Sequence, residues 1–162
     1  MALTDRVKNA LRQIFPGLGL AEQFIAVIDA KADVGGEYVV KALTETKALV
    51  NFNDNTNETG YADFTSQLPA GALVLGWKAV TTTGFAGDTL ATLQVGEAGN
   101  LNRFSAIITG SVMNVGTIGS HAPGTSDNPF CVAAVTPRLT VTGDSDFGNF
   151  NSGSVTVTSF YI

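Results

Sequence analysis

The stretch Val155-Thr156-Val157-Thr158-Ser159-Phe160-Tyr161-Ile162 alternates apolar and hydroxyl side chains before an aromatic close. A period of two places successive side chains on opposite faces, so this stretch predicts a strand with one buried face. Similar short segments rich in Val, Thr, Ala and Leu, separated by Gly, Asn, Asp and Pro, extend back to Leu68. Short strands at regular spacing with turn residues between them indicate an all-β sandwich or barrel.

The sequence therefore predicts a mainly β protein, a jelly-roll-like antiparallel β-sandwich of about eight strands. The period of two begins near Glu37, and a polar loop is expected over residues 53–60. A long projecting loop is expected over residues 119–129. Candidate strand segments are residues 38–43, 47–52, 61–66, 72–82, 89–95, 103–109, 111–118, 130–135, 139–142 and 154–162.

The first 36 residues predict a short helical N-terminal arm, so the expected domains are residues 1–36 and the sandwich of residues 37–162. Over residues 3–15, apolar residues recur at helical spacing, Thr4 is a candidate N-cap, and Pro16 follows as a stop. Residues 20–34 fit a second short helix or a strand, and we favour the helix. The stripe on the first helix consists of Leu3, Val7, Leu11 and Ile14.

Charge is sparse throughout the sequence. Charged residues make up 14% of the chain and the formal net charge is −5, whereas about 25% charged residues is usual. The negative balance argues against a broad nucleic-acid footprint. The first helix is locally basic, since Arg6, Lys8 and Arg12 stand against Asp5 alone. This pattern fits a solvated helix face, and it also fits an arm that docks on an acidic surface.

The sequence contains one cysteine, Cys131, in the apolar stretch 130–135, where a small buried hydrophobic residue is the expected role. A single cysteine forms no intrachain disulfide, so an oxidising compartment is not implied. No apolar run approaches the ~20 residues of a membrane helix, and we expect no membrane association. The apolar stretch after Arg12 is interrupted by Pro16 and Gly17, so no signal peptide is expected.

Residue patterns for catalysis or metal binding are weak. His121 stands beside Ser120 with Asp127 nearby, but neighbours on a Gly/Pro-rich loop do not make a triad, and an exposed or interface loop position is favoured. The segments 144–146 and 53–58 carry possible calcium ligands, yet such residues are common in turns. Too few His and Cys are present for a zinc site. We therefore expect no metal and no cofactor.

A glycoside hydrolase would need a pair of carboxylates across a cleft, and Asp63, Asp88, Glu97 and Asp144 are the candidates. Nothing in their spacing marks a pair. Trp77 lies in a strand segment among apolar residues, where a core position is favoured over a sugar-binding platform. The sequence thus predicts a protein that is not an enzyme.

The segments Leu68-Pro69-Ala70-Gly71-Ala72-Leu73-Val74 and Gly84-Phe85-Ala86-Gly87-Asp88 are followed by Ala91-Thr92-Leu93-Gln94-Val95-Gly96 and Asn102-Arg103-Phe104. This pattern, with the closing Val-Thr alternation, resembles jelly-roll head decoration (cement) proteins of tailed bacteriophages. It covers residues 61–109 well and the last strand less specifically, while the first 35 residues or so match no pattern of that family.

The resemblance implies a structural virion protein on the capsid surface, made in the host cytoplasm. It implies a homotrimer at three-fold and quasi-three-fold axes that binds the major capsid protein across capsomers. The candidate capsid or subunit interface is then the N-terminal arm, with residues Leu3, Arg6, Val7, Lys8, Leu11, Arg12 and Ile14. The alternative is a tail, fibre or head-spike component that binds a receptor through its loops.

Overall fold

The computed structural model describes residues 25–27, 39–54, 57–105, 111–121 and 128–162. The chain divides into two compact units, Met1–Val39 and Val40–Ile162. In the first unit, residues 25–27 are helical, in agreement with the helix favoured there over a strand. The helix expected over residues 3–15, with its candidate interface residues, lies outside the described residues. Within the described part, no helix is long and apolar enough to cross a membrane.

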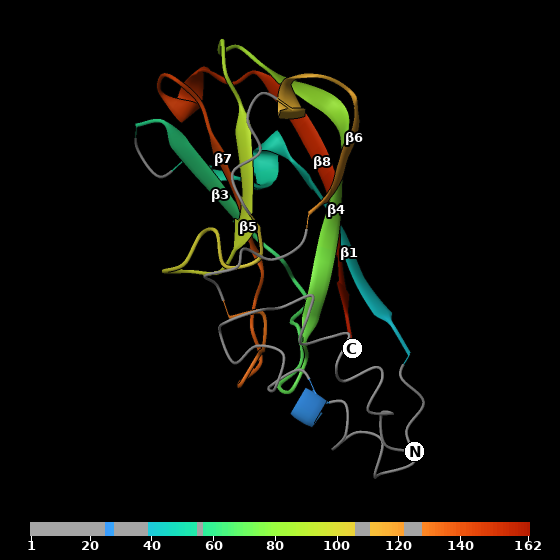
Figure 1. Cartoon of the computed structure of the whole chain (residues 1–162). Helices are drawn as coiled ribbons and strands as arrows, with labels where there is room; N and C mark the ends of the chain where they lie inside the picture. The colour runs from blue at the N-terminus through green and yellow to red at the C-terminus, as the bar shows by residue number, and fades with distance from the viewer. Residues whose placement is uncertain (1–24, 28–38, 55–56, 106–110, 122–127) are drawn as a thin grey trace. The chain divides into compact units, whose positions relative to one another are not determined.

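The described part of the second unit forms two four-stranded sheets, in which every strand pairing is antiparallel. Sheet A has the order β1-β8-β4-β6, and sheet B has the order β2-β3-β7-β5 (Figure 1). The strands of sheet A are β1 (Lys41–Ala48), β8 (Ser152–Tyr161), β4 (Val74–Ala86) and β6 (Gly116–His121). Those of sheet B are β2 (Asn53–Asp54), β3 (Thr59–Asp63), β7 (Arg138–Thr142) and β5 (Thr92–Gly96).

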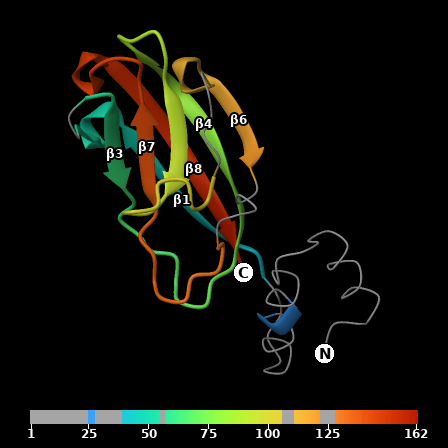
Figure 2. The ribbon, with the colours of Figure 1, turned by 60° about the vertical axis from the view of Figure 1, so that its left-hand side comes forward.

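The predicted β-sandwich is confirmed. From β3 to β8, each successive strand lies in the sheet opposite to the one before it. The two sheets lie face to face when the molecule is turned, with β3, β5 and β7 in front of β4 and β8 (Figure 2). Such alternation is the strand order expected of a jelly roll, and this finer assignment stays a prediction.

Strand β8 lies at the centre of sheet A and pairs with β1 on one side and β4 on the other. Its alternation has the predicted effect, because Val155 and Val157 are buried while Thr156 and Thr158 are partly exposed on the outer face. Trp77 on β4 is fully buried opposite Ser159, which confirms the core position expected for it. The core between the sheets also contains Phe85, Leu93, Val95, Leu139 and Val141.

Four phenylalanine rings close the core at one end of the sandwich. Phe52 and Phe85 meet edge to face with ring centroids 5.7 Å apart, and Phe147 and Phe150 meet at 5.3 Å. Phe85 also contacts Phe150, at 5.8 Å. Each edge-to-face pair contributes about 0.5–1.5 kcal/mol beyond the burial of its area. Two 3-10 helices present these rings, η1 (Leu49–Asn51) next to Phe52 and η3 (Phe147–Asn149).

Several predicted strand boundaries were wrong. Residues 38–43 and 47–52 do not form two strands, because β1 runs unbroken through Thr44 and Thr46 and the chain then turns into η1. Residues 130–135 do not form a regular strand. Phe130 and Val135 pair only through isolated bridges, with Leu73 and Leu68. Residues 103–105 lie in a turn and not in a strand.

The polar segments also differ in part from prediction. The loop expected over residues 53–60 contains the two-residue strand β2, which pairs with β3. Residues 119–121, the first part of the loop expected over residues 119–129, belong to β6 and not to a loop. Between residues 111 and 118, the 3-10 helix η2 (Ser111–Met113) precedes the strand.

Candidate functional site

All seven residues of the predicted N-terminal interface lie outside the described part of the chain, and their role stays a prediction. They are Leu3, Arg6, Val7, Lys8, Leu11, Arg12 and Ile14. The structure does place most of the residues considered for catalysis and metal binding, and it shows contacts that hold the two sheets together.

Asp63 lies in an ion pair on the outer face of sheet B. Arg138 of β7 donates to both of its carboxylate oxygens, from Nε at 2.6 Å and from a terminal nitrogen at 2.8 Å. The same guanidinium lies 3.9 Å from the ring centroid of Tyr61 on β3. Asp63 and Tyr61 are two residues apart on β3, so their side chains point to one face, and Arg138 bonds one and stacks on the other. The carboxylate is thus committed to joining β3 and β7.

Glu97 is held in the same way at a loop. Arg103 donates to Glu97 Oε1 at 2.6 Å and to the backbone carbonyls of Asn128 and Phe130 at 3.0 and 2.9 Å. The side chains of both partners are mostly buried. This arrangement fixes the loop after β5 against the segment that leads to β7.

Asp88 and Asp144, two of the candidate carboxylates, do meet. The backbone amides of Asp144 and Ser145 donate to Asp88 Oδ2, each at 3.1 Å, and the Thr89 hydroxyl donates to Asp144. The side-chain hydrogen bond with Asp144 lowers the pKa of Asp88 most, desolvation opposes it, and the amides of Thr89 and Ser145 lower it further, to about 2. These bonds organise a turn, with the two carboxylates on adjacent loops.

The segments considered for calcium binding, residues 144–146 and 53–58, have structural roles where they are described. Asp146 caps η3, accepting a hydrogen bond from the amide of Gly148 at 2.8 Å. Asn53 and Asp54 belong to β2. Among the described residues, no group of three or more His, Cys, Asp and Glu side chains is arranged to hold a metal ion.

His121 is the last residue of β6, where its backbone pairs with that of Trp77. It therefore lies at the end of a strand, not within a loop as predicted. Ser120 pairs with Lys78 on the same strand pair, and Asp127 lies outside the described residues.

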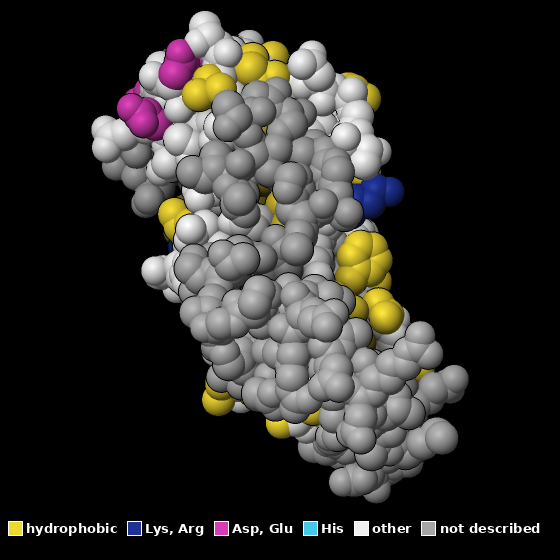
Figure 3. Space-filling view, in the orientation of Figure 1, with side chains coloured by type: hydrophobic (Ala, Val, Ile, Leu, Met, Phe, Trp, Pro, Cys, Tyr) yellow, Lys and Arg dark blue, Asp and Glu magenta, His cyan; other side chains and the backbone are white. Residues whose placement is uncertain are grey.

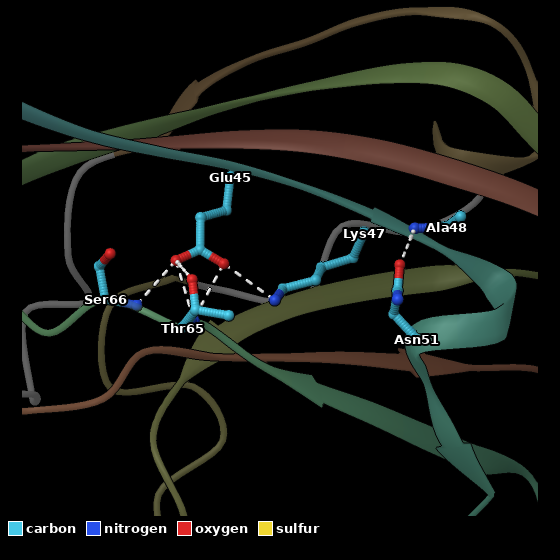
Figure 4. A network of polar contacts seen from close by, with 6 residues as sticks. All are labelled: Glu45, Lys47, Ala48, Asn51, Thr65 and Ser66. Carbon is cyan, nitrogen blue, oxygen red and sulfur yellow. Dashed lines mark hydrogen bonds and ion pairs between the residues drawn. The ribbon is translucent and has the colours of Figure 1, made fainter.

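A polar network on β1 was not anticipated from the sequence. Figure 4 shows Glu45 and Lys47 pointing from β1 toward Thr65 and Ser66, which follow β3 of the other sheet. Glu45 accepts hydrogen bonds from the backbone amides of Thr65 and Ser66, each at 2.8 Å to Oε1, and from Lys47 Nζ at 2.8 Å. Both charged side chains are almost fully buried, with 13% of Glu45 and 10% of Lys47 exposed.

The sequence did contain a signal for this network. Glu45 and Lys47 share the inward phase of β1 with Leu43, opposite Val157 and Val155 of β8. Two charges in phase with core residues need partners inside, because a buried charge is costly unless it is paired and hydrogen-bonded. The partners come from the chain that leaves sheet B, so the network fastens one sheet to the other.

Acidic side chains gather at the end of the sandwich where the phenylalanine rings lie. In Figure 3 they lie together at the upper left of the visible face. The sequence segments 49–59, 86–92 and 142–152 carry no Lys, Arg or His. Their acidic residues are Asp54, Glu58, Asp88, Asp144 and Asp146. We call these five residues the acidic end.

No family model matches the chain, and no curated protein matches it. A solved structure described as "Cyanophage Pam1 capsid asymmetric unit" contains a chain with a similar fold, at a TM-score of 0.54 and 21% sequence identity. The match covers 78% of this chain and 88% of that chain. Likeness at this level of identity establishes the fold.

Proposed function

We propose that this protein is a structural virion protein that decorates and stabilises the capsid shell of a tailed bacteriophage by binding across capsomers. The observation that carries the proposal is the fold shared with a chain of a cyanophage capsid asymmetric unit, over 78% of this chain and 88% of that one. The match therefore extends over most of both chains.

The carboxylates considered for catalysis are engaged in ion pairs and hydrogen bonds within the fold, which supports a structural role over a catalytic one. Asp63 and Glu97 are each paired with an arginine that also stacks on an aromatic ring, and Asp88 accepts backbone amides. A general acid or base needs a carboxyl group free to reach a substrate proton. We therefore propose a protein that is not an enzyme and needs no cofactor.

The proposed partners are the major capsid protein and further copies of this chain. We propose a homotrimer at three-fold and quasi-three-fold axes, because repeated weak contacts at symmetric positions sum to strong binding. The N-terminal arm, residues 1–36, is the proposed gripping element, through the apolar stripe of its first helix and the basic residues Arg6, Lys8 and Arg12. The protein would be synthesised in the host cytoplasm and reside on the capsid surface.

The test is binding to expanded, empty heads of the phage that encodes the protein, prepared without it and followed by co-sedimentation. Light scattering on a sizing column gives the native mass of the free protein. We expect saturable binding, and loss of binding on deletion of residues 1–15 while the circular dichroism of the β-body is kept. No binding of the full chain to heads would refute the decoration role, and unchanged binding after the deletion would refute the role of the arm.

A further inference from the structure

The outer face of sheet A is unusually poor in charge. Its side chains alternate with the core-facing residues of each strand, and all of them are exposed or partly exposed. Protein surfaces commonly carry about a quarter to a third charged residues, whereas the described side chains of this face include one charged residue, Lys78. The described outer face of sheet A includes Ala42, Thr44, Thr46, Lys78, Val80, Thr82, Thr117, Ser154, Thr156, Thr158 and Phe160.

Four hydroxyl groups on this face are paired with one another across β1 and β8. Thr44 and Thr158 lie opposite each other on β1 and β8 with their Oγ1 atoms 2.9 Å apart. The next row repeats the arrangement, with Thr46 and Thr156 at 2.7 Å. Removing a hydroxyl from water is costly when it has no partner, and these pairs supply one within the sheet. The face can therefore be covered by another surface at a reduced desolvation cost.

The face is also large enough to support specific binding. Ten residues of β8 at about 3.4 Å each give a length of about 34 Å, and four strands spaced about 4.8 Å apart give a width of about 19 Å. The product is about 650 Å², close to the ~800 Å² that each partner buries in a standard protein interface. Binding of this kind needs no pocket, because a partner surface that matches the twist of the sheet can pack directly on its face.

Charge indicates what kind of surface fits. The five residues of the acidic end lie on β2 and on loops at one end of the sandwich, and none of them belongs to the outer face of sheet A. Lys78 on β4 is exposed and lies opposite Thr158 on β8, next to the pair of Val80 and Thr156. A complementary partner is uncharged except for a carboxylate opposite Lys78.

We propose that the outer face of sheet A is the surface that docks on the shell protein, against an uncharged patch with one carboxylate facing Lys78. This inference rests on the proposed function and names its contact surface. The N-terminal arm and the outer face of sheet A would then both contact the shell protein.

The experiment compares two matched variants of the full chain in the head-binding assay. Thr156→Glu places a negative charge at the centre of the face, between Thr46 and Val80. Gln94→Glu places the same charge on the outer face of sheet B, where Gln94 is partly exposed opposite Thr140. We expect Thr156→Glu to weaken head binding at least tenfold with an unchanged native mass, and Gln94→Glu to bind like the wild type.

Lys78→Glu keeps the proposal testable if Thr156→Glu does not fold, because Lys78 is exposed. We expect Lys78→Glu to weaken binding more than Lys78→Ala does. If Thr156→Glu and Lys78→Glu both bind heads as the wild type does, the proposed surface is overturned and the decoration role stands. A change in native mass with Thr156→Glu overturns it in favour of contact between copies. Failure of the wild type to bind heads overturns both.

Discussion

The carboxylate of Glu45 accepts the backbone amide of Thr65 with both oxygens, at 2.8 and 3.0 Å. Glu45 belongs to the first strand of sheet A, and Thr65 follows the last residues of β3 in sheet B. The contact joins two segments that lie 20 residues apart in the sequence and on opposite sheets. It acts as a crosslink between the two sheets, in addition to the packing of the core.

Replacement of Glu45 by Gln should destabilise the fold. The substitution removes the charge that pairs with Lys47 and leaves that ammonium group mostly buried. Leaving a buried polar group unsatisfied costs about 1–3 kcal/mol, and we expect the free energy of unfolding in urea to fall by that amount. Glu58→Gln, the same change at an exposed position, is the control and should shift it by less than about 0.5 kcal/mol. Equal stability of the two variants would contradict the crosslink.

The same network predicts a pH dependence of stability. Burial raises the pKa of Glu45, but bonds from Lys47, the amides of Thr65 and Ser66 and the Thr65 hydroxyl outweigh it and lower the pKa from 4.5 to about 2. Protons therefore bind the unfolded chain more readily than the folded one, so the stabilisation is complete above about pH 4.5 and is lost as the pH falls toward 2.

The measurement is the urea midpoint at a series of pH values from about 6 down to about 2.5, for the wild type and for Glu45→Gln. As the pH falls through this range, we expect the urea midpoint of the wild type to decrease more steeply than that of Glu45→Gln. Asp88, whose pKa is also about 2, leaves a residual slope of the same sign in both proteins. Parallel curves would show that Glu45 does not contribute to the acid sensitivity.

Gly60→Ala should test the packing of the aromatic end. A Cβ atom at Gly60 would overlap the ring of Phe147, so glycine is required there by close approach. Overpacking of this kind typically costs about 1–3 kcal/mol. We expect Phe147→Leu in the Gly60→Ala background to cost less than Phe147→Leu alone, because the smaller side chain relieves the overlap. Additive effects in this double-mutant cycle would argue against direct contact.

Cys131 should report on the opening of the fold. The side chain is fully buried, and burial raises the pKa of its thiol, opposed by Arg103 and assisted by Glu97. A protonated, buried thiol reacts poorly, since the thiolate is the nucleophile. We expect no reaction with a disulfide reagent in native buffer and one equivalent per chain in urea. Fast reaction in native buffer would mean that the loop of residues 130–135 opens locally.

The sequence predicted the fold where side-chain alternation is strict. Along β8, valine and threonine change faces at every step, and the strand ends within two residues of its expected limits. Residues 130–135 have the same apolar character but lie between Pro129 and Pro137, which cannot donate ladder hydrogen bonds. Their pairing with residues 68–73 is therefore limited to isolated bridges. Whether such a segment forms a strand depends on pairing partners from distant parts of the chain, and the local composition does not identify these partners.

The candidate site was harder to predict. Carboxylates were recognised individually, but the arginines that hold Asp63 and Glu97 follow them by 75 and 6 residues, and only the fold shows which pairs form. The threonines of β1 and β8 were visible as alternation, yet their face-to-face hydroxyl pairs depend on the register of two strands more than 100 residues apart.

The inward-facing charges of β1 have one more consequence. Among the described strands, β1 forms an outer edge of sheet A, and an open edge invites pairing with the edge of another molecule. A strand that carries Glu45 and Lys47 on its core side is a poor template, because an added neighbour would continue the sheet past a charged interior. The two charges thus work against fibril growth from this edge.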